Sequence, residues 1–482
     1  MKKIAIFIFV LFIPFFVFAQ ENSSDLENDL FGGDEDTLIS AEEARSDSKS
    51  NLKFKADLEK ASLSLESKKL RIGGSLSSSM GINYAWVDPY SKKDDYLKSF
   101  KDGKGTFNTT LNGSLFFDAR PNEDLKLYGK FLFGFPFEKS LSGALTVPKN
   151  SFGPLQPNDI ILPIGVNGAA NIKIQELYTD FSAKNIAFFR FGKHAVKWGT
   201  GYFYSPADVI NISRIDPQDP TADREGGISL RTHIIIPKTQ HNIWLYLLPP
   251  GQGEDFDPKY TAGAAKGEFV VGNWELGFGG WYKYEKAPRL ITTVSGSIAG
   301  KVAVFGEGVF AWGSDYTYYK ADMSPYTEKN KPFFQATLGG SYSNADTNTS
   351  IALQYFYNGF GYSNTDVSTS ILEKAEDPVS LSDASFRKKL QNVLAMGNRG
   401  QHYIALNISQ NKLGTDKLSL NLFQQFAISE LEGFSKLTLN WKIYKFASMS
   451  TGPSFSYPLS PNSKTKGEVR YSRSFRLGGG TF

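Results

Sequence analysis

Cysteine is absent from the 482-residue chain, and histidine and methionine are scarce, with four and five residues. Without cysteine the chain can form no disulfide and carries no N-terminal Cys for acylation, which excludes a disulfide scaffold and a lipoprotein. Beyond the first 18 residues, no stretch offers the roughly 20 consecutive apolar residues that a bilayer-spanning helix needs. The histidines lack the spacing of a metal site and the glycine-rich stretches lack that of a phosphate-binding loop. Neither a metal nor a cofactor is therefore expected at the four histidines, which are His194, His233, His241 and His402.

Residues 1–19 have the features of a cleaved secretory signal. Lys2 and Lys3 precede an apolar run that ends in a small-residue site at Ala19, and Pro14 makes the run too short and irregular for a membrane anchor. Residues 20–50 hold ten acidic residues against two basic ones, and 20–69 are predicted to form a mostly disordered periplasmic leader. The leader either stays solvated or docks on a basic partner, and 52–69 fit a short helix or a strand equally well. The chain is expected to be exported by a diderm bacterium.

From Leu70 onward, apolar residues recur at every second position within short segments, for example in 125–133, 351–357, 418–422 and 437–443. This period predicts β-strands with one apolar and one polar face. A soluble sandwich would also alternate, but its core would be mainly aliphatic, whereas these segments often carry Tyr, Trp and Phe near their ends. Aromatic residues at strand ends are typical of the interfacial girdles of a membrane barrel.

Short polar turns and longer connections alternate between these segments. The eight short turns lie at 121–124, 183–185, 237–240, 272–273, 300, 344–348, 411–416 and near 445. The nine longer connections are 87–105, 135–171, 199–226, 250–260, 285–291, 314–332, 359–400, 427–433 and 458–466. Outer-membrane barrels are connected in this way, with tight periplasmic turns and long extracellular loops.

These connections imply about 18 strands with both ends periplasmic, and 16 strands is the alternative if the weak segment 291–299 drops out. The predicted fold class is therefore all-β, a transmembrane antiparallel up-and-down β-barrel formed by residues 70–482. Barrels of this size leave an aqueous channel rather than a packed interior.

Charges predicted to face the lumen are mostly basic. The acidic residues predicted there are Glu275 and Asp180. The basic residues are Arg190, Lys126, Lys130, Lys442, Arg470 and Arg476. Basic rings favour anions, so the pattern predicts either a mild anion preference or a balance with acidic loops at the mouth. The basic residues are spread over many segments rather than clustered, which argues against nucleic acid.

No spacing indicates catalysis. His402 with Ser409, or Asp208 with His194, could be paired at a barrel rim, but a chain of this length offers such pairs by chance. No catalytic residue is proposed and the protein is not expected to be an enzyme.

The stretch FFRFGKHAVKWG (188–199) and the polar loop after it are the most distinctive part of the chain. They resemble a pattern in several porin-like outer-membrane families, in which an Arg-x-Gly-Lys strand leads to Trp-Gly and then to a Pro-x-Asp loop. The matching residues here are Arg190, Gly192, Lys193, Trp198, Gly199, Pro206 and Asp208, and the resemblance covers about 40 residues. It implies a passive or substrate-selective channel and identifies no substrate.

Parity in this stretch places Phe189 and Phe191 toward lipid and Arg190 toward the lumen. Lys193 then falls on the lipid side, so either a bulge near Gly192 shifts the register or the strand has left the membrane by Lys193. The loop carries both signs of charge, as a transverse field across a constriction requires. The candidates for constriction and selectivity are Arg190, His194, Asp208, Arg214, Asp216, Asp219, Asp223 and Arg224.

Two further segments give specific expectations. In 380–397, Ser382 is predicted to cap a helix that ends at Gly397, with Phe386, Leu390, Val393 and Leu394 on one face. This helix either packs on neighbouring loops or folds into the lumen as a partial lid. The final strand is expected to end at Leu477 or to contain a bulge, because Phe482 falls on the other parity.

The predicted function is a porin-like channel in the outer membrane, through which small polar or anionic solutes diffuse. The alternatives are a transporter of hydrophobic substrates such as fatty acids and a surface adhesin barrel. Expected partners are outer-membrane lipid, small solutes and the barrel-assembly machinery, which would recognise the strand ending at Phe482. A homo-oligomer is left open.

Overall fold

The computed structural model describes residues 70–87, 103–122, 124–136, 171–183, 186–250, 257–375, 380, 382–460 and 467–478. Several sequence-based expectations fall outside these residues: the signal at 1–19, the leader at 20–69, most of the proline-containing loop 135–171, and Phe482.

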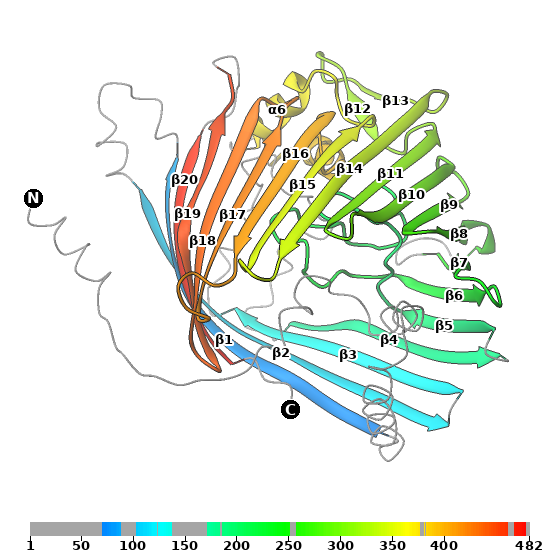
Figure 1. Cartoon of the computed structure of the whole chain (residues 1–482). Coiled ribbons are helices and arrows are strands. Elements are labelled where there is room, and N and C mark those ends of the chain that lie inside the picture. The colour runs from blue at the N-terminus through cyan, green and yellow to red at the C-terminus, as the bar shows by residue number, and fades with distance from the viewer. Residues whose placement is uncertain are drawn as a thin grey trace, which may run out of the picture. The chain divides into compact units, whose positions relative to one another are not determined.

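Eighteen antiparallel strands form one sheet, shown in Figure 1. Each strand pairs with the next one along the chain, and β1 pairs with both β2 and β20, so the sheet closes into a barrel. The strands are β1 (Leu70–Val87), β2 (Lys104–Asn122), β3 (Leu125–Pro136), β4 (Asn171–Ala183), β5 (Ala187–Lys193), β6 (Ile228–Ile235), β7 (Asn242–Leu248), β8 (Ala262–Val271), β9 (Trp274–Tyr282), β10 (Arg289–Ile298), β11 (Val302–Trp312), β14 (Pro332–Asn344), β15 (Thr349–Asn358), β16 (His402–Gln410), β17 (Leu418–Ala427), β18 (Glu432–Tyr444), β19 (Ala447–Pro458) and β20 (Glu468–Gly478).

The predicted strand number and fold class are confirmed. The weak segment 291–299 forms most of β10, which pairs along its length with β9 and β11, so the 16-strand alternative is wrong. Because consecutive strands are antiparallel, all the short turns lie at one rim of the barrel and all the long connections at the other. The final strand ends at Gly478, one residue beyond the expected Leu477.

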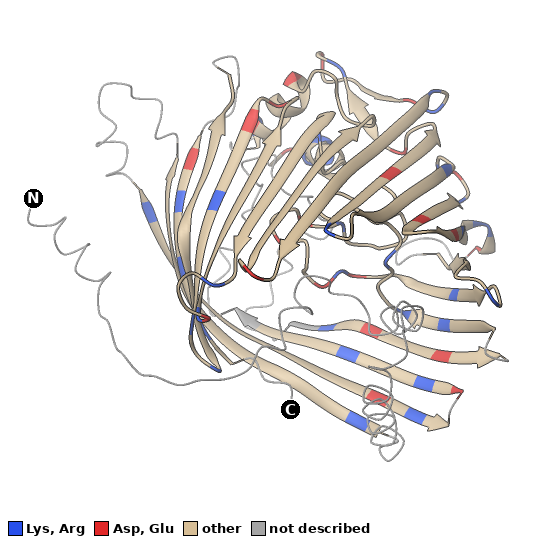
Figure 2. Ribbon diagram, in the orientation of Figure 1, with Lys and Arg blue, Asp and Glu red and all other residues tan. Residues whose placement is uncertain are grey.

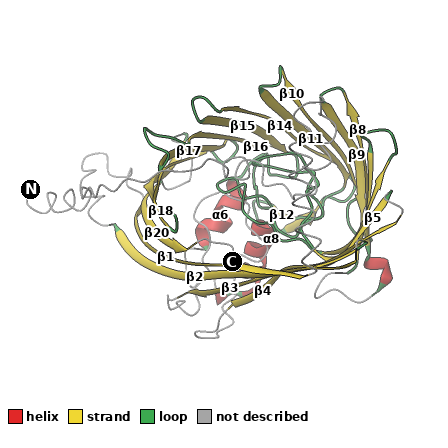
Figure 3. Ribbon diagram, turned by 60° about the horizontal axis from the view of Figure 1, so that its bottom comes forward, coloured by secondary structure: helices red, strands yellow, loops and turns green. Residues whose placement is uncertain are grey.

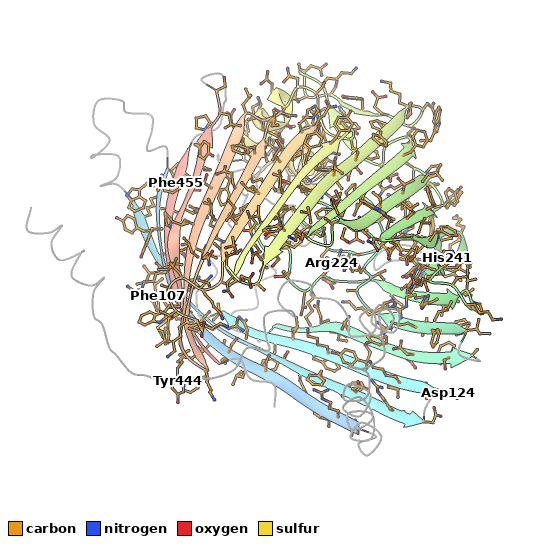
Figure 4. The ribbon with its side chains drawn as sticks, viewed as in Figure 1. Phe107, Asp124, Arg224, His241, Tyr444 and Phe455 are labelled. Atoms are coloured by element: carbon orange, nitrogen blue, oxygen red, sulfur yellow. The ribbon has the colours of Figure 1, made fainter. Side chains whose placement is uncertain are left out.

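Alternate residues of each strand face opposite sides of the barrel wall. Large apolar side chains with high exposure share the outer parity, among them Ile82 (55%), Phe107 (59%), Phe278 (56%) and Leu338 (62%). In Figure 4, Phe107 and Phe455 lie at the outer margin of the strands, whereas Arg224 lies among the strands. The sheet therefore presents an apolar outer face, and polar side chains gather on its inner face.

The long connections carry the remaining regular elements. The connection between β11 and β14 contains the hairpin β12 (Thr317–Tyr319) with β13 (Pro325–Thr327), and a short 3-10 helix, η1 (Pro258–Tyr260), precedes β8. The connection between β15 and β16 contains α6 (Asp366–Lys374) and α8 (Ala384–Ala395). None of the helices formed by the described residues is long and apolar enough to span a bilayer.

The helix predicted at 380–397 is confirmed as α8, with one correction to its start. Asp383 rather than Ser382 caps it, because the Asp383 carboxylate accepts a hydrogen bond from the backbone N–H of Ser385. Leu390, Val393 and Leu394 are buried against α6 and β12, and Gly397 ends the helical turn with φ 71°. The helix α6 was not predicted.

Candidate functional site

Residues 194–227 connect β5 to β6 and are here called the inner segment. Their side chains and backbone contact residues of β3, β8, β11, β15 and β17, which lie on widely separated parts of the ring. Because the contacting wall residues face inward, the inner segment must run through the interior of the barrel. Figure 3, turned to look more nearly into the barrel, shows loops, α6, α8 and β12 enclosed by the ring of strands.

Glu307 on β11 is the strongest anchor of the inner segment. Its carboxylate accepts hydrogen bonds from the backbone N–H groups of Thr200 (2.6 Å), Gly201 (2.5 Å) and Ala207 (2.8 Å) and from the hydroxyl of Ser205 (2.9 Å). The side chain is almost fully buried, at 5% exposure. A buried carboxylate requires several donors, and this one obtains them by binding the backbone of residues 200–207 to the wall.

Gln354 on β15 is the second anchor and is fully buried. Its side-chain oxygen accepts from the backbone N–H groups of Phe203 (2.7 Å) and Tyr202 (3.1 Å), and its amide group donates to the carbonyl of Tyr204 (2.6 Å). The hydroxyl of Tyr204 in turn accepts a hydrogen bond from Gln425 on β17 at 2.7 Å. Three neighbouring residues of the inner segment are thus fixed to two strands.

Apolar packing reinforces these polar anchors. Trp198 is 2% exposed and meets the ring of Tyr246 on β7 edge-on, with centroids 5.0 Å apart. Phe203 is 1% exposed and packs in a cluster with Phe423 and Phe434 on β17 and β18. These contacts pack residues 198–203 of the inner segment against the wall at β7, β17 and β18.

The Trp-Gly pair of the resemblance has a local physical explanation. A Cβ atom on Gly199 would overlap the Ser205 hydroxyl and the Glu307 carboxylate, so only glycine allows the backbone to approach this anchor. The backbone carbonyl of Trp198 accepts a hydrogen bond from the buried ammonium group of Lys266 at 3.0 Å. The Trp198-Gly199 pair therefore lies where the inner segment is attached to β8 and β11.

Ion pairs hold the other end of the inner segment to β3, β4 and β5. The Glu225 carboxylate lies 2.6 Å from the Nζ of Lys173 and 2.7 Å from that of Lys193. Burial alone would raise the pKa of Glu225, but hydrogen bonds and charge from the two lysines outweigh it, so the pKa is lowered. Within the segment, Arg224 pairs with the buried carboxylate of Asp208.

Asp216, Asp219 and Asp223 lie on one exposed stretch of the inner segment, residues 216–223, here called the acidic turn. The Asp219 backbone N–H donates to the Asp216 carbonyl at 3.0 Å, which closes the turn. The Asp223 carboxylate lies 2.6 Å from the Nζ of Lys130 on β3, yet its side chain remains 65% exposed. The acidic turn therefore presents an exposed carboxylate, that of Asp223, to the interior beside β3.

A group of basic side chains, here called the basic wall, lines the inner face of β18, β20, β1 and β3. Lys442, Ser448, Arg476 and Ser79 form one row of paired residues across four strands, so Lys442 and Arg476 share the inner face. Figure 2 shows lysine and arginine on this side of the barrel. The members are Arg71, Lys126, Lys130, Lys442, Arg470 and Arg476.

Some members of the basic wall have acidic neighbours. Arg470 pairs with Glu468 at 2.9 Å, and Lys126 lies 3.7 Å from Asp118. Lys442 and Arg476 are exposed and form no ion pair with any described residue. The acidic turn and the basic wall thus present opposite charges to the same interior.

Arg190 lies on β5 in the wall, and His194 is the first residue of the inner segment, next to the end of that strand. The guanidinium group of Arg190 makes two hydrogen bonds to Asp180 (2.7 and 2.9 Å) and stacks 4.0 Å from the ring centre of Tyr178. His194 is fully buried, and burial followed by the charges of Arg190 and Arg231 lowers its pKa to about 3. Strand β5 ends at Lys193, with Gly192 at φ 131°, and the chain then turns inward into the inner segment.

Arg214 connects the inner segment to the two-helix loop. Its guanidinium group donates to the backbone carbonyls of Met396 (2.7 Å) and Ala395 (3.1 Å) at the end of α8, and to the hydroxyl of Tyr316 (3.0 Å). A positive group at a helix C-terminus complements the helix dipole. Arg214 therefore joins three long connections inside the barrel.

Among the described residues, no group of three or more His, Asp or Glu side chains has the geometry to hold a metal ion. His402 lies on the outer face of β16, where its Nδ1 is 2.8 Å from the hydroxyl of Tyr355. His194 and Asp208, paired above as a candidate catalytic combination, are each engaged elsewhere: His194 Nδ1 with the Gly192 carbonyl at 3.1 Å, and Asp208 with Arg224.

Glu307, Gln354 and Gln425 were not identified from the sequence. Each lies within a regular strand, and its importance depends on partners in the inner segment that are 100 to 221 residues away in the chain: backbone groups for Glu307 and Gln354, and the Tyr204 hydroxyl for Gln425. The available signal was Glu307 itself, a single acid in the apolar segment VAVFGEGVFAW.

No protein-family model matches the chain, and no curated protein matches its sequence. Its structure is similar to solved barrels at low identity. OccAB1 of Acinetobacter baumannii is 10% identical, with 84% of this chain and 96% of that chain covered and a TM-score of 0.45. OccK11 (OpdR) of Pseudomonas aeruginosa is 10% identical, with 85% and 96% covered and a TM-score of 0.44. OmpF of Salmonella typhi, in a complex with daunomycin, is 9% identical, with 85% and 97% covered and a TM-score of 0.39. The fold rests on the strand pairings above rather than on these scores.

Proposed function

We propose that this protein is an outer-membrane channel of the porin type, through which small polar or anionic solutes diffuse. The observation that carries the proposal is a closed 18-stranded barrel whose interior holds a wall-bound segment with exposed carboxylates opposite exposed basic side chains. A barrel of this size has room for an aqueous channel. The inner segment narrows that interior, and its charges act on any solute that passes.

The outer face supports the membrane location. Exposed Leu, Ile, Val and Phe side chains recur around the ring, and an apolar face of this extent is unfavourable in water. Tyr444 and Phe446 flank the turn at Lys445 with exposures of 63% and 56%, as expected for an interfacial aromatic girdle. The rim with the short turns is then periplasmic, and the long connections are extracellular.

The charges favour anions mildly. Lys442 and Arg476 form no ion pair among the described residues, whereas the nearest carboxylate of the acidic turn, Asp223, already faces Lys130. Small anions therefore encounter unneutralised positive charge along the basic wall, while the acidic turn limits how strong the preference becomes.

Planar-bilayer recording of the refolded, purified protein tests the proposal. Stable ohmic current steps are expected. Silence together with ligand-dependent uptake would favour the hydrophobic-substrate transporter, and silence together with surface binding would favour the adhesin.

The same proposal includes export and assembly. Residues 1–19 act as a cleaved signal, 20–69 as an acidic periplasmic leader, and the C-terminal end of the chain, with its last residue Phe482, as the contact for the barrel-assembly machinery. Lipid of the outer membrane surrounds the barrel. Assembly into a homo-oligomer is compatible with this arrangement and would be measured by the mass of the detergent-solubilised protein.

A further inference from the structure

One charged residue interrupts the outer face of the barrel. Charged residues in the interiors of the 18 described strands face inward. The exception is Arg473 on β20. Lys193, which ends β5 on the outer parity, turns inward to Glu225. A charge on the lipid face is costly at mid-bilayer and nearly free at the interfaces, so its position along the strand matters.

The register establishes that Arg473 points outward. Phe434, Ser456 and Glu468 are paired in one row, and Phe434 packs in the interior cluster with Phe203. Glu468 therefore faces inward, and Arg473, five residues further along the same strand, faces outward. Its partner on β1 is Ile82, which is 55% exposed on the apolar outer face.

The side chain of Arg473 extends toward the rim with the short turns. Its Nε lies 3.2 Å from the sulfur of Met449, and Met449 is paired with Phe475, two residues closer to that rim. Met449 is four residues from Lys445 in the short turn between β18 and β19, which corresponds to about 10 Å along the membrane normal for a strand tilted by roughly 40°. The guanidinium group therefore lies near the interface rather than at the centre of the apolar band.

The guanidinium group has most of its hydrogen-bonding capacity unused. It can donate five hydrogen bonds, and a thioether is a weak acceptor. Among the described residues no carboxylate pairs with Arg473, and no acidic side chain lies on the outer face of the strand interiors, so the outer face of a second copy would offer no such partner either. Within the part of the chain that the structure describes, the group therefore has unused donors that an external anion on the outer face can satisfy.

We propose that Arg473 binds the phosphate group of a phospholipid in the leaflet at the short-turn rim, with the phosphate at the level of Met449 and Phe475 and the acyl chains running past Ile82 toward the bilayer centre. Arginine matches phosphate because its planar group donates two parallel hydrogen bonds. The hydroxyls of Thr451 and Tyr471 are 2.7 Å apart on the same outer face, and they lie on the extracellular side of the guanidinium group of Arg473. The inference rests on the membrane location contained in the proposed function.

Native mass spectrometry of the refolded full-length protein, titrated with dimyristoyl phosphatidylglycerol, tests the inference. The wild-type protein should retain one phospholipid more tightly than the rest, and Arg473→Leu should weaken that affinity about tenfold, as expected for losing one charge-assisted contact. Arg476→Leu is the matched control, since it removes an arginine from the inner face of the same strand, and it should leave the lipid affinity unchanged. Arg473→Lys keeps the charge without the paired donors and should lie between the two.

Equal lipid affinity in the wild type and Arg473→Leu would overturn the inference, as would a change in oligomeric mass without a change in bound lipid. Heat-modifiable migration on a gel establishes that each variant forms a barrel; if Arg473→Leu does not fold, the comparison is made with Arg473→Gln. Bilayer recording of the same preparations separates the two proposals. A silent wild-type protein that keeps its phospholipid refutes the channel and not the lipid site.

Discussion

Replacing Glu307 with alanine removes one acceptor from four donors at once. The backbone N–H groups of Thr200, Gly201 and Ala207 and the hydroxyl of Ser205 all point at this carboxylate. In the variant these donors face a cavity, whereas the barrel ladder of β11 with β10 and β14 remains intact. The expected result is local release of residues 200–207 from the wall, with the barrel still folded.

The size of the effect follows from the hydrogen bonds. Each hydrogen bond to a charged group contributes roughly 1.5–3 kcal/mol, but the four share one acceptor and are not additive, so about 4 kcal/mol is a reasonable total. Gln354 continues to hold residues 202–204 and Trp198 still packs on Tyr246, so the change is confined to local opening at the groups that Glu307 binds, on either side of 202–204. A change of about 4 kcal/mol raises the opening equilibrium by roughly 10³.

Two assays measure the release. Hydrogen exchange at the Thr200, Gly201 and Ala207 amides should accelerate by up to roughly 10³, and single-channel conductance should rise and become noisier. Glu275→Ala is the control, because Glu275 is also an inward-facing carboxylate and accepts no hydrogen bond from the inner segment among the described residues. Unchanged exchange at these three amides in Glu307→Ala would refute the anchoring role.

Four other perturbations have defined outcomes. Arg214→Ala removes three hydrogen bonds between the inner segment and the connections that contain α8 and β12, and it should raise single-channel conductance. Deletion of 380–397 should raise the conductance as well. Unchanged conductance in both variants would contradict a lid. Lys442→Glu with Arg476→Glu should move the reversal potential in a KCl gradient toward cation preference, whereas Lys301→Glu, in a short turn, should not. His194 has a pKa lowered from 6.5 to about 3, so folding stability is complete above pH 6.5 and declines as the pH falls toward 3, by roughly 3 kcal/mol at pH 4. His194→Gln should flatten that decline in thermal unfolding measured between pH 4 and 7, and an unchanged slope would exclude His194 as its source.

Local patterns were sufficient to predict the barrel. Within segments such as 437–443, the alternation of apolar and polar residues depends only on neighbouring residues. The alternation of short and long connections predicts 18 strands, and the structure has 18, closed into a barrel by the pairing of β1 with β20. The α8 helix was visible for the same reason, since the spacing of Leu390, Val393 and Leu394 is local.

The interior contacts could not be predicted in this way. Parity correctly put Arg190 on the inner face, but it carried no information that Asp180, ten residues earlier on the neighbouring strand, would bind it. The same applies to Arg214, whose partners lie more than 100 residues away on two other connections. Which residues of the inner segment remain available to a solute depends on pairings between distant strands, and the one-dimensional pattern does not contain them.

The reversal potential of the wild-type channel in a KCl gradient tests the central claim most directly. If solutes pass between the acidic turn and a basic wall whose Lys442 and Arg476 form no ion pair with the described residues, the current should reverse on the anion side, and the double glutamate variant should shift it. Clear cation selectivity of the wild type, or a protein that never opens a conducting path, would contradict the account.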